Sequence, residues 1–208
     1  MGATSSFIHH FEKGGEPDVR PLLLLHGTGG DENDLAPLGR MIAPGAPLLS
    51  PRGRVLENGM PRFFRRLAEG VFDEQDVHDR AQELADFVVQ ACARYAISSP
   101  IALGYSNGAN IAAALLLLRP EVLAGAILLR ATVPLSQTPP VDLTDKPILI
   151  ASGVSDPMIP LEGANRLAAA LQQQGALVEH RTLPIGHQLS QADVTLARAW
   201  MQAHGRLN

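Results

Sequence analysis

A single serine lies between two glycines in the segment Gly-Tyr-Ser-Asn-Gly (104–108). The residues before it are apolar and predict a strand, and residues 107–119 predict a helix. A sharp turn from a strand into a helix strains its middle residue and needs small neighbours. It also presents that residue at the start of the helix, where free N–H groups favour negative charge. Ser106 is therefore a candidate nucleophile, and the alternative is a turn serine that caps the helix.

A serine hydroxyl is a weak nucleophile until a base takes its proton, and in this architecture the partners follow in the order serine, acid, histidine. Three histidines come after Ser106 in the chain: His180, His187 and His204. His180 lies inside a strand pattern, and His204 lies near the end of the chain. His187 follows a predicted strand in the loop sequence PIGHQLS, so it is the candidate base; the alternative is a histidine of a surface loop.

The acid of such a site is expected in a loop after another strand. Asp156 comes just past the predicted strand 148–152, whereas Asp142 and Asp145 precede this strand and belong at the opposite edge of the sheet. An aspartate in this place would orient the imidazole and stabilise its charged form. Asp156 is therefore the candidate acid, and the alternative is a turn aspartate before Pro157.

Acyl transfer also needs N–H donors for the oxyanion. The residue after the nucleophile, Asn107, would supply one donor, and the glycine-rich loop that follows Leu25 would supply the other. Within this loop the backbone N–H of Thr28 is the first choice and that of Gly29 the second. A loop of this kind can also hold phosphate, but the chain has neither a G-x-G-x-x-G sequence nor a P-loop lysine, which argues against a nucleotide site.

Strands and helices alternate along the chain in a way that would bring these loops to one edge of a sheet. Most predicted strands are near-continuous apolar runs, as in a parallel sheet covered on both faces: 21–27, 46–51, 99–105, 122–129, 146–152 and 176–183, with 5–14 as an added edge strand. Helices are predicted over 76–95, 107–119, 161–174 and 190–204. The expected fold is α/β, with a doubly wound, mostly parallel sheet and helices on both faces, in one domain over 1–208.

Composition excludes several classes of protein. The 208 residues carry a formal net charge of −4, and the densest basic cluster is the short RFFRR at 62–66, so nucleic acid is not an expected partner. The apolar runs are too short to span a bilayer, and the first residues do not match a signal peptide, so we expect no membrane partner and a cytoplasmic location. The single cysteine, Cys92, allows no intrachain disulfide and is interpreted as a small core residue.

Taken together, these motifs resemble the phospholipase/carboxylesterase branch of the α/β-hydrolase superfamily, which includes acyl-protein thioesterases. The matching segments are spread over most of the chain: LHGTGGDENDL (25–35), SPRG (50–53), GYSNGAN (104–110), SGVSDPMIP (152–160) and GH (186–187). The resemblance implies Ser106, Asp156 and His187 as a catalytic triad, with Thr28 and Asn107 as oxyanion donors. One departure is Thr-Gly-Gly at 28–30, where many relatives have Leu-Gly-Asp.

The chain is thus expected to be a serine carboxylesterase that acts on small esters, with thioesters as a second class, and that needs no metal or organic cofactor. The competing hypothesis is a ligand-binding sensor that keeps the fold and triad but turns over little. Related families include homodimers, although the sequence shows no exposed stripe that identifies an interface.

Two observations bear on the substrate pocket. Only residues 130–145 separate the predicted strand 122–129 from the next, too few for a helical cap, so we expect esters of short to medium acyl chain.

The segment 52–75 contains Phe63, Phe64 and Phe72, which would either wall the pocket or belong to the core. Arg52 and Arg130 each follow a predicted strand, where they would either bind anionic esters or serve as surface or structural residues.

Overall fold

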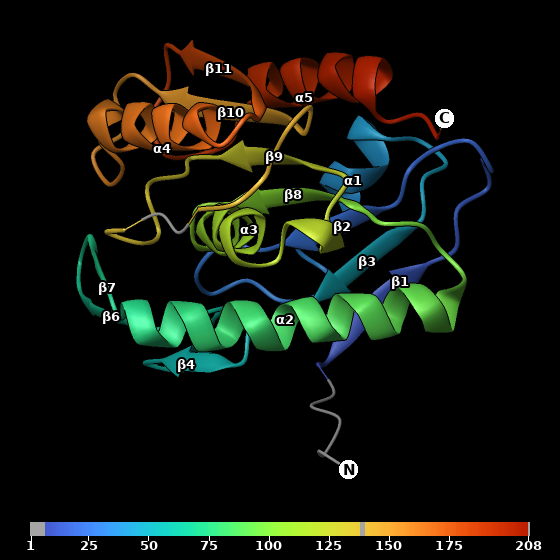
Figure 1. Ribbon diagram of the computed structural model, residues 1–208, viewed down its shortest axis with the longest axis horizontal. Coiled ribbons are helices and arrows are strands. Elements are labelled where there is room, and N and C mark those ends of the chain that lie inside the picture. Colours follow the sequence, from blue (N-terminus) through green and yellow to red (C-terminus); the bar gives the residue numbers. More distant parts are fainter. Residues whose placement is uncertain (1–6, 138–139, 208) are drawn as a thin grey trace.

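A computed structural model describes residues 7–137 and 140–207. Its centre is a sheet of seven strands, all parallel to their neighbours except β1, which pairs antiparallel with β3. Across the sheet the order is β1 (His9–Glu12), β3 (Leu48–Pro51), β2 (Leu22–Leu25), β8 (Ile101–Tyr105), β9 (Gly125–Leu129), β10 (Pro147–Gly153) and β11 (Leu177–Leu183). The predicted α/β-hydrolase fold with a mostly parallel sheet is confirmed (Figure 1).

Helices cover both faces of the sheet because successive strand residues point to opposite sides. The α-helices of the described residues are α1 (Ala36–Ile42), α2 (Glu74–Tyr95), α3 (Asn107–Leu118), α4 (Leu161–Gln173) and α5 (Gln191–His204). Leu23 and Leu25 belong to the core beneath α2, α3 and α4, whereas Leu22 and Leu24 belong to the core beneath α1 and α5. The apolar runs of the sequence therefore become strands buried on both faces.

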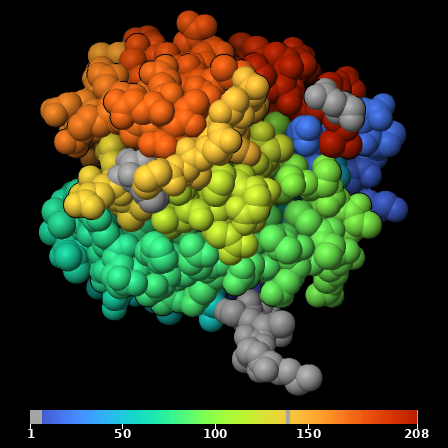
Figure 2. All heavy atoms as spheres, in the orientation of Figure 1, coloured from blue at the N-terminus to red at the C-terminus, as the bar shows by residue number. Residues whose placement is uncertain are grey.

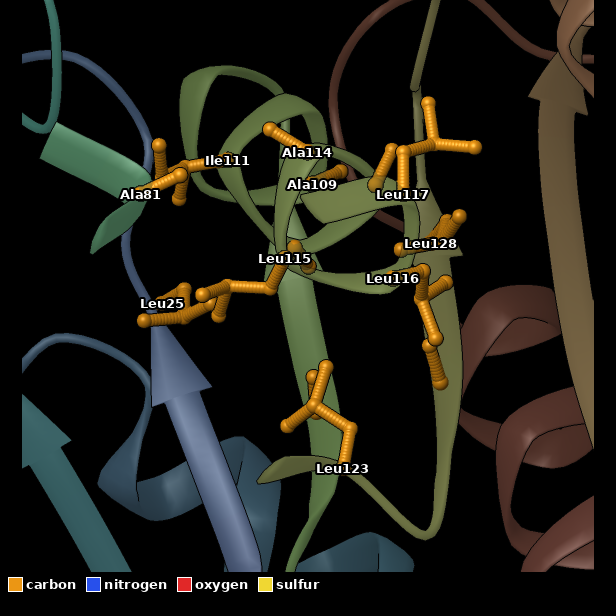
Figure 3. Close-up of a cluster of buried hydrophobic side chains, with 14 of the residues drawn as sticks. Leu25, Ala81, Ala109, Ile111, Ala114, Leu115, Leu116, Leu117, Leu123 and Leu128 are labelled. Carbon is orange, nitrogen blue, oxygen red and sulfur yellow. The ribbon is translucent and has the colours of Figure 1, made fainter. Parts of the chain in front are cut away.

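The helix that follows the candidate nucleophile is the most deeply buried one. Residues 107–117 of α3 are all buried. Figure 3 shows Leu115 beside Leu25 of β2, Leu116 beside Leu128 of β9, and Ile111 beside Ala81 of α2. This explains why α3 is apolar all round: a helix packed between a sheet and another helix has almost no solvent face.

The structure adds elements that the sequence did not predict. Besides α1, there are two small hairpins, β4 (Val55–Glu57) with β5 (Met60–Arg62), and β6 (Arg66–Ala68) with β7 (Val71–Phe72). Asn58 and Gly59 turn the first hairpin with φ of 51° and 80°. Asn-Gly is a strong hairpin signal, so this turn was readable from the sequence. The predicted strand 122–129 is shorter than expected, because Pro120–Val122 forms a 3₁₀ turn and β9 begins at Gly125.

The segment between β9 and β10 forms no helix in the part that the structure describes, so no helical cap is seen there. In Figure 2 this segment, in yellow, lies on the surface between α4 and α2. The β6–β7 hairpin lies on the same side of the molecule (Figure 1). Among the described helices, none combines the length and apolar character needed to cross a membrane.

Candidate active site

The turn between β8 and α3 holds Ser106 in a strained conformation, with φ of 54° and ψ of −115°. Both neighbouring glycines are required by close backbone approach. A methyl group on Gly104 would lie 2.5 Å from the carbonyl oxygen of Gly108, and one on Gly108 would overlap the carbonyl oxygen of Leu25. The serine N–H donates to the carbonyl oxygen of Leu129 at 2.8 Å, which ties the turn to β9.

The three candidate residues from separate loops meet in one chain of hydrogen bonds. His187 Nε2 lies 3.0 Å from Ser106 Oγ, and His187 Nδ1 lies 2.8 Å from Asp156 Oδ2. The other carboxylate oxygen of Asp156 accepts from the backbone N–H groups of Met158 (2.8 Å) and Ile159 (3.0 Å). The Asp156 side chain is 1% exposed, so these donors replace the water that a buried carboxylate would otherwise need.

The backbone around His187 is held at three consecutive carbonyl groups. Arg130 donates to the carbonyl oxygens of Gly186 (Nε, 3.0 Å) and Gln188 (Nη2, 3.1 Å), and the hydroxyl of Tyr105 donates to that of His187 (3.2 Å). Tyr105 and Arg130 both stand at the carboxyl end of the sheet, one in β8 and the other directly after β9. The imidazole is thus fixed from the backbone side as well as by Asp156.

Arg130 is therefore not a pocket residue, and the expectation that it lines the substrate site is corrected. Its side chain is fully buried and forms a two-point ion pair with Asp193, at 2.8 Å and 2.9 Å. Asp193 also accepts from the N–H of Ser190 in the capping box of α5. A guanidinium buried this deeply requires such a fixed set of acceptors.

The loop after β2 carries the candidate oxyanion donors. The second choice, Gly29, is excluded because its N–H donates to the carbonyl oxygen of Pro61 at 2.9 Å. No carbonyl of the described residues accepts from the backbone N–H of Thr28 or of Asn107, so both donors are free for a ligand. The hydroxyl of Thr28 accepts from Arg62 Nη1 at 2.6 Å, and this hydrogen bond fixes the threonine side chain.

His26, as a neutral imidazole, stabilises the first residues of this loop. Its Nδ1 lies 2.6 Å from the carbonyl oxygen of Gly27, so Nδ1 carries the proton, and its Nε2 accepts from the N–H of Gly53 at 2.9 Å. Burial lowers the pKa of His26 and so favours this neutral form.

The chain is similar in sequence to known proteins. The sequence profile of the family described as Phospholipase/Carboxylesterase matches residues 8–205. The chain belongs to this family. Its similarity to the Bacillus subtilis protein named "Putative hydrolase MhqD" is 48% identity over 194 residues, 92% of this chain and 96% of that one.

Solved structures of family members have nearly the same fold. The crystal structure of the Bacillus cereus carboxylesterase matches with a TM-score of 0.93 and 42% identity, over 96% of this chain and 95% of that one. A carboxylesterase from Mesorhizobium loti matches with a TM-score of 0.88 and 34% identity, over 92% of each chain. These relatives support an esterase activity for this member of the carboxylesterase family.

In this carboxylesterase-family chain, Ser106 opens into a cavity of about 390 Å³. Thr28 and Asn107 line it beside the serine, and the remaining wall comes from α3, the end of β5, the β6–β7 hairpin, the start of α4 and the loops after β9 and β10. Its polar lining includes Asn110 and Thr132, and its apolar lining includes Met158 and Ile159. The cavity is therefore lined by both polar and apolar side chains.

Of the three phenylalanines proposed for this wall, only Phe72 lines the cavity. The expectation for Phe63 and Phe64 is corrected, since they are 3% and 0% exposed and belong to the core. The backbone of Phe63 nevertheless serves the site, because its N–H donates to Asn107 Oδ1 at 2.7 Å. Arg52 also lies outside the cavity and pairs with Glu32, Nη2 to Oε1 at 2.8 Å, so its proposed contact with substrate is corrected as well.

Three cavity residues were within reach of sequence reasoning but were missed. Arg62 and Arg66 belong to the basic cluster that was considered only as a nucleic-acid signal. Asn110, one turn along α3 from Ser106, also lines the cavity; its Oδ1 accepts from the N–H of Thr132 at 2.9 Å. A polar residue one turn after a nucleophile on an otherwise apolar helix is the signal that would have found it.

Proposed function

We propose that this chain is a serine carboxylesterase in which Ser106, His187 and Asp156 form the catalytic triad. The observation that carries the proposal is the position of the His187 ring, within hydrogen-bonding distance of Ser106 on one side and Asp156 on the other. His187 takes the hydroxyl proton as Ser106 Oγ attacks the acyl carbon, and then gives it to the departing alcohol. Water attacks the acyl-enzyme by the same route, releasing the acid and restoring the serine.

The negative oxygen that forms during both steps would be stabilised by the N–H groups of Thr28 and Asn107. Their freedom from partners among the described residues supports this role, since a fixed and unused donor costs no reorganisation when charge develops. The residues that attack, transfer protons and stabilise charge are all supplied by the chain. The same arrangement would hydrolyse thioesters, which pass through an equivalent acyl-enzyme.

The sensor alternative is separated from an esterase by the fate of the acyl-enzyme. Rapid mixing with an excess of p-nitrophenyl acetate is expected to give continued release of p-nitrophenol over many turnovers. A sensor would release about one equivalent and then stop, because its acyl-enzyme would persist. Release limited to the first turnover would therefore replace the esterase proposal with the sensor.

The expected substrate size follows from the cavity volume and from the described residues between β9 and β10, which form no helical cap. Each methylene that becomes buried contributes about 0.8 kcal/mol, so kcat/KM should rise about fourfold per methylene until the cavity is full. We expect this rise to end at short to medium chains in a series of p-nitrophenyl esters from acetate to palmitate. A continuous rise to palmitate, or a jump in rate when micelles form, would contradict the expectation.

The buried Arg130 provides a test of how strictly His187 must be placed. Arg130→Lys keeps a positive charge beside Asp193 but cannot donate to both flanking carbonyl groups. We expect kcat to fall by about 10- to 100-fold with a smaller change in KM, since a displacement of about 1 Å costs on the order of 10²-fold.

Arg119→Lys is the matched control for this variant, because Arg119 also pairs with carboxylates but does so on α2 and the 3₁₀ turn, away from the cavity. Thermal unfolding of both variants separates a loss of placement from a loss of fold. A folded Arg130→Lys variant with wild-type kcat would show that Asp156 alone is enough to place the imidazole.

A further inference from the structure

Three arginines line the cavity in front of Ser106: Arg62, Arg66 and Arg166. Arg62 is the last residue of β5 and Arg66 the first of β6, whereas Arg166 belongs to α4. The ester bond itself carries no net charge, and hydrolysis through Ser106 and His187 assigns no task to these cations. Three cations around a cavity of about 390 Å³ indicate a role in binding.

The cluster of Arg62, Arg66 and Glu57 carries an excess of positive charge. Arg62 is 3% exposed, and Arg66 is partly buried; both pair with the same carboxylate, Glu57, at 3.1 Å and 2.9 Å respectively. Two guanidinium groups against one carboxylate leave one cation uncompensated within this cluster. Burial lowers the pKa of Arg62, but an arginine stays charged in proteins, so the uncompensated charge persists at neutral pH.

Two negative side chains also line the cavity, and they are exposed, as is Arg166; the less exposed Arg62 and Arg66 act more strongly than any of these three charges. Glu69 lies at the turn of the β6–β7 hairpin and Glu162 in the first turn of α4, and both are exposed. Exposed charges are screened by water and salt much more than buried ones. Arg166, also exposed, has no carboxylate of the described residues within ion-pairing distance.

We propose that the cavity selects esters whose acyl part ends in a carboxylate, held by Arg62, Arg66 and Arg166. This inference rests on the proposed function. A guanidinium fork matches a carboxylate in two parallel hydrogen bonds, which makes arginine the usual partner for this group. Arg62 donates through Nε to the carbonyl oxygen of Phe64 and through Nη1 to the hydroxyl of Thr28, whose backbone N–H faces the reacting oxygen in the proposed mechanism. A carboxylate held by the rest of this guanidinium would lie near the reacting ester, so the acyl chain between them would be short. Monoesters of short dicarboxylic acids fit both requirements.

The test compares two substrates of the same shape, monoethyl glutarate and ethyl glutaramate, which differ in a terminal carboxylate or amide. Hydrolysis is followed by acid release at neutral pH. We expect kcat/KM of the wild type to be at least about tenfold higher for monoethyl glutarate, the usual gain from a hydrogen bond to a charged group. Equal or faster hydrolysis of ethyl glutaramate would overturn the inference and leave the esterase proposal intact.

Variants identify the residues responsible. Arg166→Gln is expected to lower the carboxylate-to-amide ratio of kcat/KM by about tenfold, and Arg66→Gln combined with it by more. The control is Arg198→Gln, an exposed arginine on α5 outside the cavity, which should leave the ratio unchanged. An unchanged ratio in both cavity variants would also overturn the inference.

A binding measurement covers the case in which neither ethyl ester is turned over. Calorimetry with glutarate and the Ser106→Ala protein should detect binding that weakens about tenfold when Arg166→Gln is added. Absence of glutarate binding would refute the anionic subsite. Turnover of p-nitrophenyl acetate reports separately on whether the protein is an esterase.

Discussion

Ser106→Ala is expected to lower kcat for activated esters by about 10⁶-fold while the protein stays folded. In a comparable triad, removal of the nucleophile alone costs on the order of 10⁶ in kcat, because no acyl-enzyme can form. The alanine should be tolerated, since Ser106 contributes no side-chain cap to α3 and its backbone bond to Leu129 remains. The measurement is kcat for p-nitrophenyl acetate, together with circular dichroism and thermal unfolding.

The matched control is Ser155→Ala, which removes an exposed serine hydroxyl from the loop that also carries Asp156. It should keep wild-type kcat, because among the described residues the Ser155 hydroxyl takes no part in the hydrogen bonds of the triad. A Ser106→Ala variant that keeps even a tenth of wild-type activity would mean that another group attacks the ester.

Asp156→Asn has the second-largest expected effect, a loss of roughly 10⁴-fold in kcat. An asparagine would offer an N–H to Nδ1, so the imidazole would keep its proton on Nε2 and could not accept one from Ser106. KM should change little, because the carboxylate faces His187 and two backbone N–H groups and not the substrate.

The comparison variant is Asp142→Asn. Asp142 is not a candidate acid, because it precedes the predicted strand 148–152; in the structure its side chain accepts from the N–H of Thr144. We expect its kcat to match the wild type within about twofold, as is usual for a surface change outside the site. A mild Asp156→Asn phenotype beside a severe Asp142→Asn phenotype would contradict the proposed acid.

The central strands and the serine turn were predictable because single local rules determine them. Near-continuous apolar runs such as 22–25 and 101–105 are compatible with strands of a sheet that is buried on both faces and with few other structures. The Gly-x-Ser-x-Gly turn is equally constrained, since the backbone leaves no room for a side chain at Gly104 or Gly108. The candidate acid and base then followed from strand order, because parallel strands bring their carboxyl ends to one edge.

The pocket residues were harder to predict because their positions depend on contacts distant in sequence. Arg130 follows a strand at the ligand-binding edge, which is equally compatible with a pocket and with burial. Its burial depends on Asp193, which lies 63 residues later and is identified only by the fold. Phe63 and Phe64 share this ambiguity, whereas Arg62 and Arg66 reach the cavity only because the β4–β5 hairpin turns the chain back toward Thr28.

The most direct measurement of the central claim is covalent labelling with a fluorophosphonate probe, followed by mass spectrometry of the digested protein. The probe reacts with a serine that a neighbouring base has activated, whatever the natural ester is. We predict one adduct per chain, located on Ser106, with labelling slowed strongly in Asp156→Asn and absent in Ser106→Ala. Failure of the folded wild type to label, or an adduct on a different residue, would contradict the proposed triad.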